Sequence, residues 1–306
     1  MPLPTSATPG PATRLARPRP YLARPPAAAA RYFSCFFSST TSAWAGSVLA
    51  ADAKPKDATV RARLALGHFY QGDAAAAEAA AAAALKLDKQ EPIARYVMAE
   101  VTLRQGDEAS AKQQITKLIA DGHDSYDLRV RLAELAVSGG DLAGAIAQLC
   151  AAKRLDPERS YPYQALAEIY KKQGQDAAAL LELEQFVMLE QMQVGPLREL
   201  VDAYAAQQAW PKVKTYGELA LALFPSDADL LTTLGKAYLA LGDGKAALYS
   251  YDSALVVDPP MRRPALAHIG RVRAYLALGD KANAKAALAA AAKTEPAHAD
   301  VVELKK

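Results

Sequence analysis

The chain has 306 residues, of which 51% are hydrophobic and 23% are charged, and its formal net charge at pH 7 is +3. Five arginines and no acidic residue lie in residues 1–51, so setting those five charges aside leaves −2 for residues 52–306. This near-neutral body lacks the basic face that nucleic-acid binding requires, and two cysteines are too few for a disulfide framework.

Residues 1–53 form a leader that is rich in Pro, Ala and Arg and then in Ser and Thr. It can be a secretory signal, with a diluted apolar core from Tyr32 to Leu49 and a small-residue cleavage site near Ala50. It can equally be a mitochondrial transit peptide, or a disordered extension of a cytoplasmic protein. We favour export to the cell envelope or periplasm, with the working protein beginning near Ala51 to Lys54.

A glycine followed by a polar residue recurs at intervals of 34 residues along most of the remaining chain. The slots are Gly72-Asp73, Gly106-Asp107, Gly140-Asp141, Gly174-Gln175, Gln208-Ala209, Gly242-Asp243 and, after a short insertion, Gly279-Asp280. A fixed period of this size is typical of a solenoid of stacked repeats. The slots therefore predict seven repeats within residues 54–298.

Each repeat carries two stretches of about 14 residues with apolar positions at helical spacing, joined at the slot. Glycine can adopt the left-handed conformation that ends the first helix, and the aspartate after it can cap the second. Small residues recur before and after each slot, as Ala65, Ala77 and Ala84 do around Gly72. They let two antiparallel helices approach closely, so the pattern predicts helix pairs and no strands.

This residue pattern resembles that of the tetratricopeptide repeat (TPR) family over roughly residues 58–298. The resemblance implies an all-α fold, a right-handed α-solenoid of about seven helix-turn-helix repeats (an α-α superhelix) behind a disordered or cleaved leader. No transmembrane span is expected in the repeats. Residues 299–306 are predicted to form a short C-terminal capping helix.

Two repeats depart from the family pattern. The fifth has Gln208-Ala209 at its slot and Val213 where alanine is usual, and the second has Leu118 at its last small site. Both keep the 34-residue spacing. We therefore interpret them as degenerate repeats that preserve the helix pair.

The sequence contains no recognisable catalytic or cofactor motif. None of the four histidines lies at metal-ligand spacing from another His, Cys or Glu, and phosphate-binding, dinucleotide-binding and serine-nucleophile motifs are missing. Recurrent tyrosines four positions before the slot are expected to be packing residues. These are Tyr170, Tyr204, Tyr238 and Tyr275. We expect a protein that is not an enzyme and uses no metal or cofactor.

The TPR resemblance implies that the first helix of each repeat lines a concave groove, where positions two, five, nine and twelve face a bound peptide. Position nine holds, down the chain, Leu66, Glu100, Glu134, Glu168, Asp202, Lys236 and Arg273. Position five adds Tyr96, Gln164, Arg198 and Thr232. A groove that is acidic and then basic would favour an extended ligand with a basic stretch and an acidic end. The alternative is that these acids only solvate an exposed helix face.

The same positions argue against one class of partner. Chaperone-binding members of the family hold a C-terminal carboxylate with Lys and Asn at positions five and nine, where this chain begins with Ala62, Leu66, Tyr96 and Glu100. No chaperone tail is therefore expected. The resemblance implies a non-catalytic protein–protein interaction scaffold that binds a protein or peptide in its groove. The alternative is an accessory subunit or arm of an exported hydrolase or cell-envelope assembly.

Overall fold

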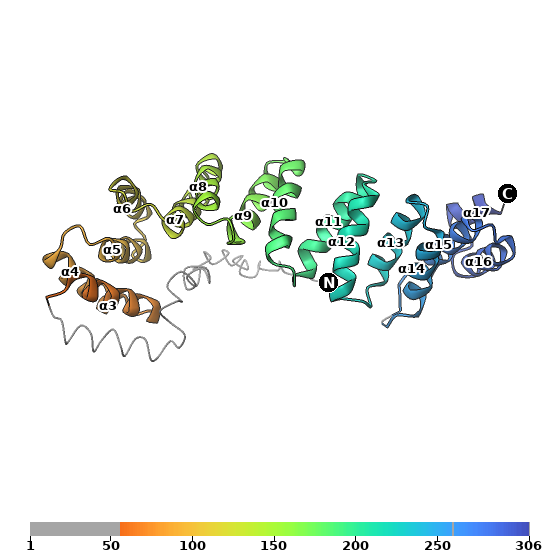
Figure 1. Ribbon diagram of the computed structural model, residues 1–306, viewed down its shortest axis with the longest axis horizontal. Helices are drawn as coiled ribbons and strands as arrows, with labels where there is room; N and C mark the ends of the chain where they lie inside the picture. Colours follow the sequence, from red (N-terminus) through yellow and green to blue (C-terminus); the bar gives the residue numbers. More distant parts are fainter. Residues whose placement is uncertain (1–55, 259, 306) are drawn as a thin grey trace, which may run out of the picture. The chain divides into compact units, whose positions relative to one another are not determined.

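The computed structural model describes residues 56–258 and 260–305 (Figure 1). Across these ranges the chain forms fifteen helices, α3 to α17, and no strand. Consecutive helices fold back on one another, as the repeat pattern predicts. The predicted leader, residues 1–53, lies outside the described residues.

Each repeat contributes one first helix and one second helix. The first helices are α3 (Ala58–Gln71), α5 (Pro92–Arg104), α7 (Tyr126–Ser138), α9 (Tyr161–Lys172), α11 (Val194–Ala206), α13 (Ala228–Ala240) and α15 (Pro264–Ala277). The second helices are α4 (Ala74–Leu87), α6 (Glu108–Ala120), α8 (Leu142–Leu155), α10 (Asp176–Leu189), α12 (Trp210–Leu223), α14 (Gly244–Val256) and α16 (Lys281–Thr294). A short helix, α17 (Ala299–Leu304), follows the last repeat.

The slot residues end one helix and begin the next by local hydrogen bonding. Gly106 has a φ of 92°, and its N–H donates to the Leu103 carbonyl at 3.0 Å while the Asp107 N–H donates to the Thr102 carbonyl. The Asp107 carboxylate then accepts from the Ser110 N–H at 3.0 Å, which caps α6. Both roles predicted for the Gly-Asp pair are confirmed.

The degenerate slot of the fifth repeat keeps this backbone geometry without glycine. Gln208 has a φ of 56°, the one positive φ on a residue other than glycine among the described residues. Its N–H donates to the Ala205 carbonyl and the Ala209 N–H donates to the Tyr204 carbonyl, at 3.1 and 2.9 Å. The prediction of a degenerate repeat with an intact helix pair is confirmed.

Gln208→Gly should raise the free energy of unfolding by about 0.5–1 kcal/mol, because glycine adopts this left-handed conformation without the steric cost of a Cβ atom. Urea denaturation followed by circular dichroism measures the change. Gln207→Gly is the matched control, since Gln207 has a φ of −83° and glycine there should destabilise. A loss of stability in both variants would contradict the strain assigned to Gln208.

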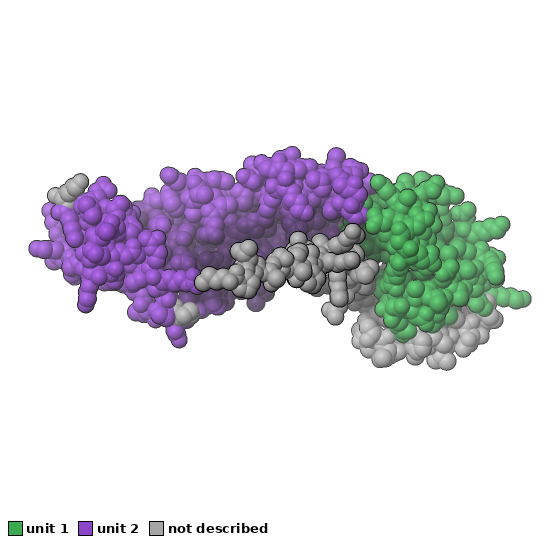
Figure 2. All heavy atoms as spheres, turned by 180° about the vertical axis from the view of Figure 1, so that it is seen from behind, with its two compact units in different colours: residues 1–135 green, residues 136–306 purple. Residues whose placement is uncertain are grey.

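Contacts divide the chain into two compact units, residues 1–135 and 136–306, with the boundary inside α7 (Figure 2). The described part of unit 1 buries a cluster from α3, α4 and α5 that is mostly alanine, so these helices approach closely. The cluster consists of Ala62, Ala65, Leu66, Phe69, Ala77, Ala81, Ala84, Ala94, Val97 and Val101.

Unit 2 buries a tyrosine at a position where the other repeats have a smaller side chain. Tyr251 of α14 is only 1% exposed, and its ring lies against Gly235 of α13 and Gly270 of α15. A Cβ atom at Gly235 would lie 2.6 Å from the ring, and one at Gly270 would lie 2.3 Å from it. The two glycines therefore make the space that the tyrosine ring fills.

Neighbouring repeats of unit 2 are also joined by bonds from tyrosine to an acid. The Tyr204 hydroxyl donates to Glu184 at 2.7 Å, and the equivalent Tyr238 hydroxyl donates to Glu218 at 2.6 Å. The equivalent of Glu184 in the third repeat is Cys150. Two of the four recurrent tyrosines, Tyr204 and Tyr238, thus link repeats through their hydroxyls, a role beyond the packing that the sequence predicts.

Candidate binding surface

The nine candidate residues lie on first helices in both compact units. Tyr96, Glu100 and Glu134 belong to unit 1. The other six belong to unit 2 and are Gln164, Glu168, Arg198, Asp202, Lys236 and Arg273. Their surroundings differ between the two units, so each unit is described by itself.

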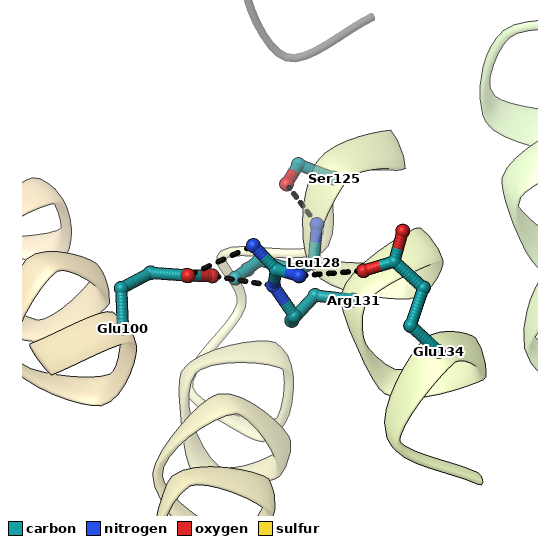
Figure 3. Close-up of polar contacts among 5 residues, drawn as sticks. All are labelled: Glu100, Ser125, Leu128, Arg131 and Glu134. Atoms are coloured by element: carbon teal, nitrogen blue, oxygen red, sulfur yellow. Dashed lines mark hydrogen bonds and ion pairs between the residues drawn. The ribbon is translucent and has the colours of Figure 1, made fainter. Parts of the chain in front are cut away.

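In unit 1, two of the predicted groove acids are held by one arginine (Figure 3). The Arg131 guanidinium on α7 donates to both carboxylate oxygens of Glu100 on α5, at 2.6 and 2.8 Å. Its remaining terminal nitrogen donates to Glu134 at 2.6 Å. The side chains of Arg131 and Glu100 are 13% and 3% exposed. Paired, bidentate hydrogen bonding is the arrangement that makes such burial of charge tolerable.

Two tyrosines extend this buried polar cluster. Burial raises the pKa of Tyr70 to about 12, and Asp127 and Glu100 act in the same direction. Burial also holds the pKa of Tyr96 well above its usual value, again with Glu100 adding to the effect. For Arg131 burial lowers the pKa, but Glu100 and Glu134 outweigh it and the pKa is raised. The arginine is therefore charged and both phenols are neutral at physiological pH.

Glu100 is consequently placed differently from the row that the sequence predicts. Its carboxylate is buried against Arg131 and does not face solvent. Arg131 also engages the partly buried Glu134. The sequence feature that indicates the Arg131–Glu134 pair is their spacing of three residues, which puts both side chains on one helix face.

In unit 2, two of the predicted bases form ion pairs. Arg198 of α11 pairs with Asp227, the residue that caps α13 through its bond to the Leu230 N–H. Arg273 of α15 pairs with Asp300 of α17 at 3.1 Å. These pairs connect each first helix to the helix two elements further along the chain, so both bases have a structural role.

The remaining four candidates of unit 2 are exposed and have no ion-pair or hydrogen-bond partner for their side chains within the described chain. They are Gln164 and Glu168 on α9, Asp202 on α11 and Lys236 on α13. Their neighbours on the same helices are paired, since Lys171 of α9 bonds to Glu199 of α11. The exposed set can therefore meet a charged ligand without first breaking an internal bond.

Other kinds of site have no counterpart in the described ranges. No group of three or more His, Cys, Asp and Glu residues there could hold a metal ion. No helix of that part of the chain is both long and apolar enough to cross a membrane. The charged first-helix residues of unit 2 therefore remain the candidate surface.

Family models and solved structures match the chain. A tetratricopeptide repeat model matches residues 265–298, and the model of the ChAPs (Chs5p-Arf1p-binding proteins) matches residues 66–215. No curated protein matches it.

The C-terminal part of a TPR repeat-containing protein from Cytophaga hutchinsonii, a solved structure, is 18% identical, with a TM-score of 0.46 over 79% of this chain and 98% of that one. A tetratricopeptide repeat protein from Parabacteroides merdae is 15% identical, with a TM-score of 0.42 over 80% and 95%. MamA is 21% identical, with a TM-score of 0.42 over 56% and 92%.

Proposed function

Because the chain is a tetratricopeptide repeat protein, and thereby a protein-interaction scaffold, we propose that the first helices of unit 2 bind an extended peptide segment of a protein partner. The binding face consists of the exposed side of α9, α11 and α13. Glu168 and Asp202 receive basic groups of the partner, and Lys236 receives an acidic group. This is the side that the family resemblance assigns to the groove.

The contrast between paired and unpaired charges supports this proposal. Arg198 and Lys171 are held by Asp227 and Glu199, whereas Glu168, Asp202 and Lys236 are exposed on the same three helices and unpaired within the described residues. A charge that is already paired must lose its partner before it can bind a ligand. An exposed unpaired charge only exchanges water for the ligand, so electrostatic complementarity can select a partner at little cost.

The same contrast leaves the acids of unit 1 out of the proposed face. Glu100 is buried against Arg131, and Glu134 shares that arginine. Withdrawing either carboxylate toward a ligand would leave the guanidinium poorly compensated in a buried place. We therefore assign these two acids to the stability of unit 1.

Selection from a displayed library of random peptides tests the proposal. Glu168→Lys/Asp202→Lys is expected to abolish enrichment of the peptides that the wild-type chain selects at low salt. The difference should shrink as salt rises, because exposed ion pairs are weak and screened. Circular dichroism should show unchanged helical content.

Glu158→Lys/Glu303→Lys is the matched control, since it makes the same change in net charge at exposed acids outside the three helices. This control should select the wild-type peptides. Equal enrichment by wild type and by Glu168→Lys/Asp202→Lys at low salt would overturn the assignment of the face.

A further inference from the structure

Three first helices of unit 2 share one hydrophobic cluster and leave their other sides exposed. Tyr163 and Ala167 of α9, Leu197 and Val201 of α11, and Leu230 and Ala237 of α13 all belong to this cluster. Because the three helices enter one core and the repeats keep their 34-residue period, we expect equivalent exposed positions to lie in one row. Glu168, Asp202 and Lys236 are such positions, each 34 residues from the next.

Ion pairs between the helices hold the row together. Lys171 of α9 bonds to Glu199 of α11, and Arg198 of α11 bonds to Asp227 at the start of α13. Lys172, one turn beyond Glu168, forms no ion pair with it in the described structure. The row therefore presents two negative charges and then one positive charge on a surface fixed by its neighbours.

The separation that is typical of packed helices gives the expected spacing of this row. Packed helices lie about 8–10 Å apart, and an extended chain advances about 3.3 Å per residue. A peptide crossing the three helices therefore moves from one helix to the next in about three residues. Ligand side chains that meet Glu168, Asp202 and Lys236 are then three positions apart.

We propose that this row selects peptide segments with basic residues at positions i and i+3 and an acidic residue at i+6, read in one chain direction. The inference rests on the proposed function and adds to it the spacing and order of the ligand charges. Gln164, exposed one turn before Glu168, offers an amide that can bond to the main chain of such a peptide. Charges at the wrong spacing leave one or more side chains of the row without a counter-charge.

Fluorescence anisotropy with the full chain tests the spacing. The matched probe carries Lys at positions 1 and 4 and Glu at position 7 in a Ser/Gly background, and its reversed sequence covers the other direction. The mis-spaced probe has the same composition with its lysines two positions apart. At low salt, whichever of the matched probe and its reversed sequence binds better should bind about three- to tenfold more tightly than the mis-spaced probe.

Lys236→Glu provides a gain-of-function test at an exposed residue. This variant should prefer a probe with Lys at positions 1, 4 and 7, whereas wild type should prefer Glu at position 7. Equal affinity for both spacings, with Glu168→Lys/Asp202→Lys weakening both, would overturn the spacing and leave the proposed function standing. No binding of any charged probe by the wild-type chain would overturn both.

Discussion

Arg131→Ala is expected to lower the free energy of unfolding of unit 1 by about 3–5 kcal/mol. The guanidinium makes both hydrogen bonds to the Glu100 carboxylate, which is only 3% exposed, and a third to Glu134. Removing it leaves a buried carboxylate without a counter-charge, and such a loss costs far more than that of an exposed pair. Urea denaturation and hydrogen exchange in α5 and α7 measure the effect.

Arg129→Ala is the matched control on the same helix. Arg129 pairs with Asp124 at 2.8 Å, but both side chains are more exposed, so the expected loss is about 1 kcal/mol or less. Glu100→Leu/Arg131→Met removes both buried charges and should recover most of the stability lost in Arg131→Ala. Similar losses in Arg129→Ala and Arg131→Ala would argue against a special role for the buried pair.

The second large effect is expected from Gly270→Ala in unit 2. The new Cβ atom would lie 2.3 Å from the ring of Tyr251, well inside van der Waals contact. The ring is buried and also lies against Gly235 of α13, so it has little room to move away from a new Cβ atom at Gly270. Overpacking of this kind typically costs about 1–3 kcal/mol, and we expect the upper end of that range in thermal unfolding.

Two further variants separate this clash from a general intolerance of alanine. Gly195 of α11 has open space at its Cβ position, so Gly195→Ala should be neutral or stabilise by up to about 1 kcal/mol. Tyr251→Leu/Gly270→Ala should lose less unfolding free energy than the two single variants lose together, because the smaller leucine leaves room for the new methyl group. Leucine occupies the equivalent place in three other repeats, as Leu149, Leu183 and Leu288. Strict additivity would show that the ring and Gly270 do not compete for space.

The fold could be predicted because its signals are local and repeated. Each of the seven predicted slots lies between the first and the second helix of a repeat, as Gly72-Asp73 does between α3 and α4. Glycine and aspartate at the slots act within a few residues of themselves, so their chemistry is readable without the tertiary structure. Even Gln208 follows, since the period fixes the conformation that its slot must take.

The candidate surface could be predicted only in part. Whether a side chain at position nine is exposed depends on ion-pair partners that lie at other positions of the repeat. Glu100 and Glu168 occupy the same place in their repeats, yet one is buried and the other exposed. The difference is Arg131, which lies 31 residues after Glu100; the residue 31 after Glu168 is Glu199, an acid that pairs with Lys171 instead. Likewise, Arg273 is held by Asp300, which lies beyond the last repeat and outside the period.

The bonds from tyrosine to acid in unit 2 bear on how cooperatively the array opens. Repeats of this kind couple only to their nearest neighbours, so each junction sets how far local opening spreads. Glu184 and Glu218 give two junctions a bond from tyrosine to a charged acceptor. At the junction before them, Cys150 occupies the place of the acid, and a thiol is a weak acceptor. We therefore expect these two bonds to spread local opening across the α10–α11 and α12–α13 junctions.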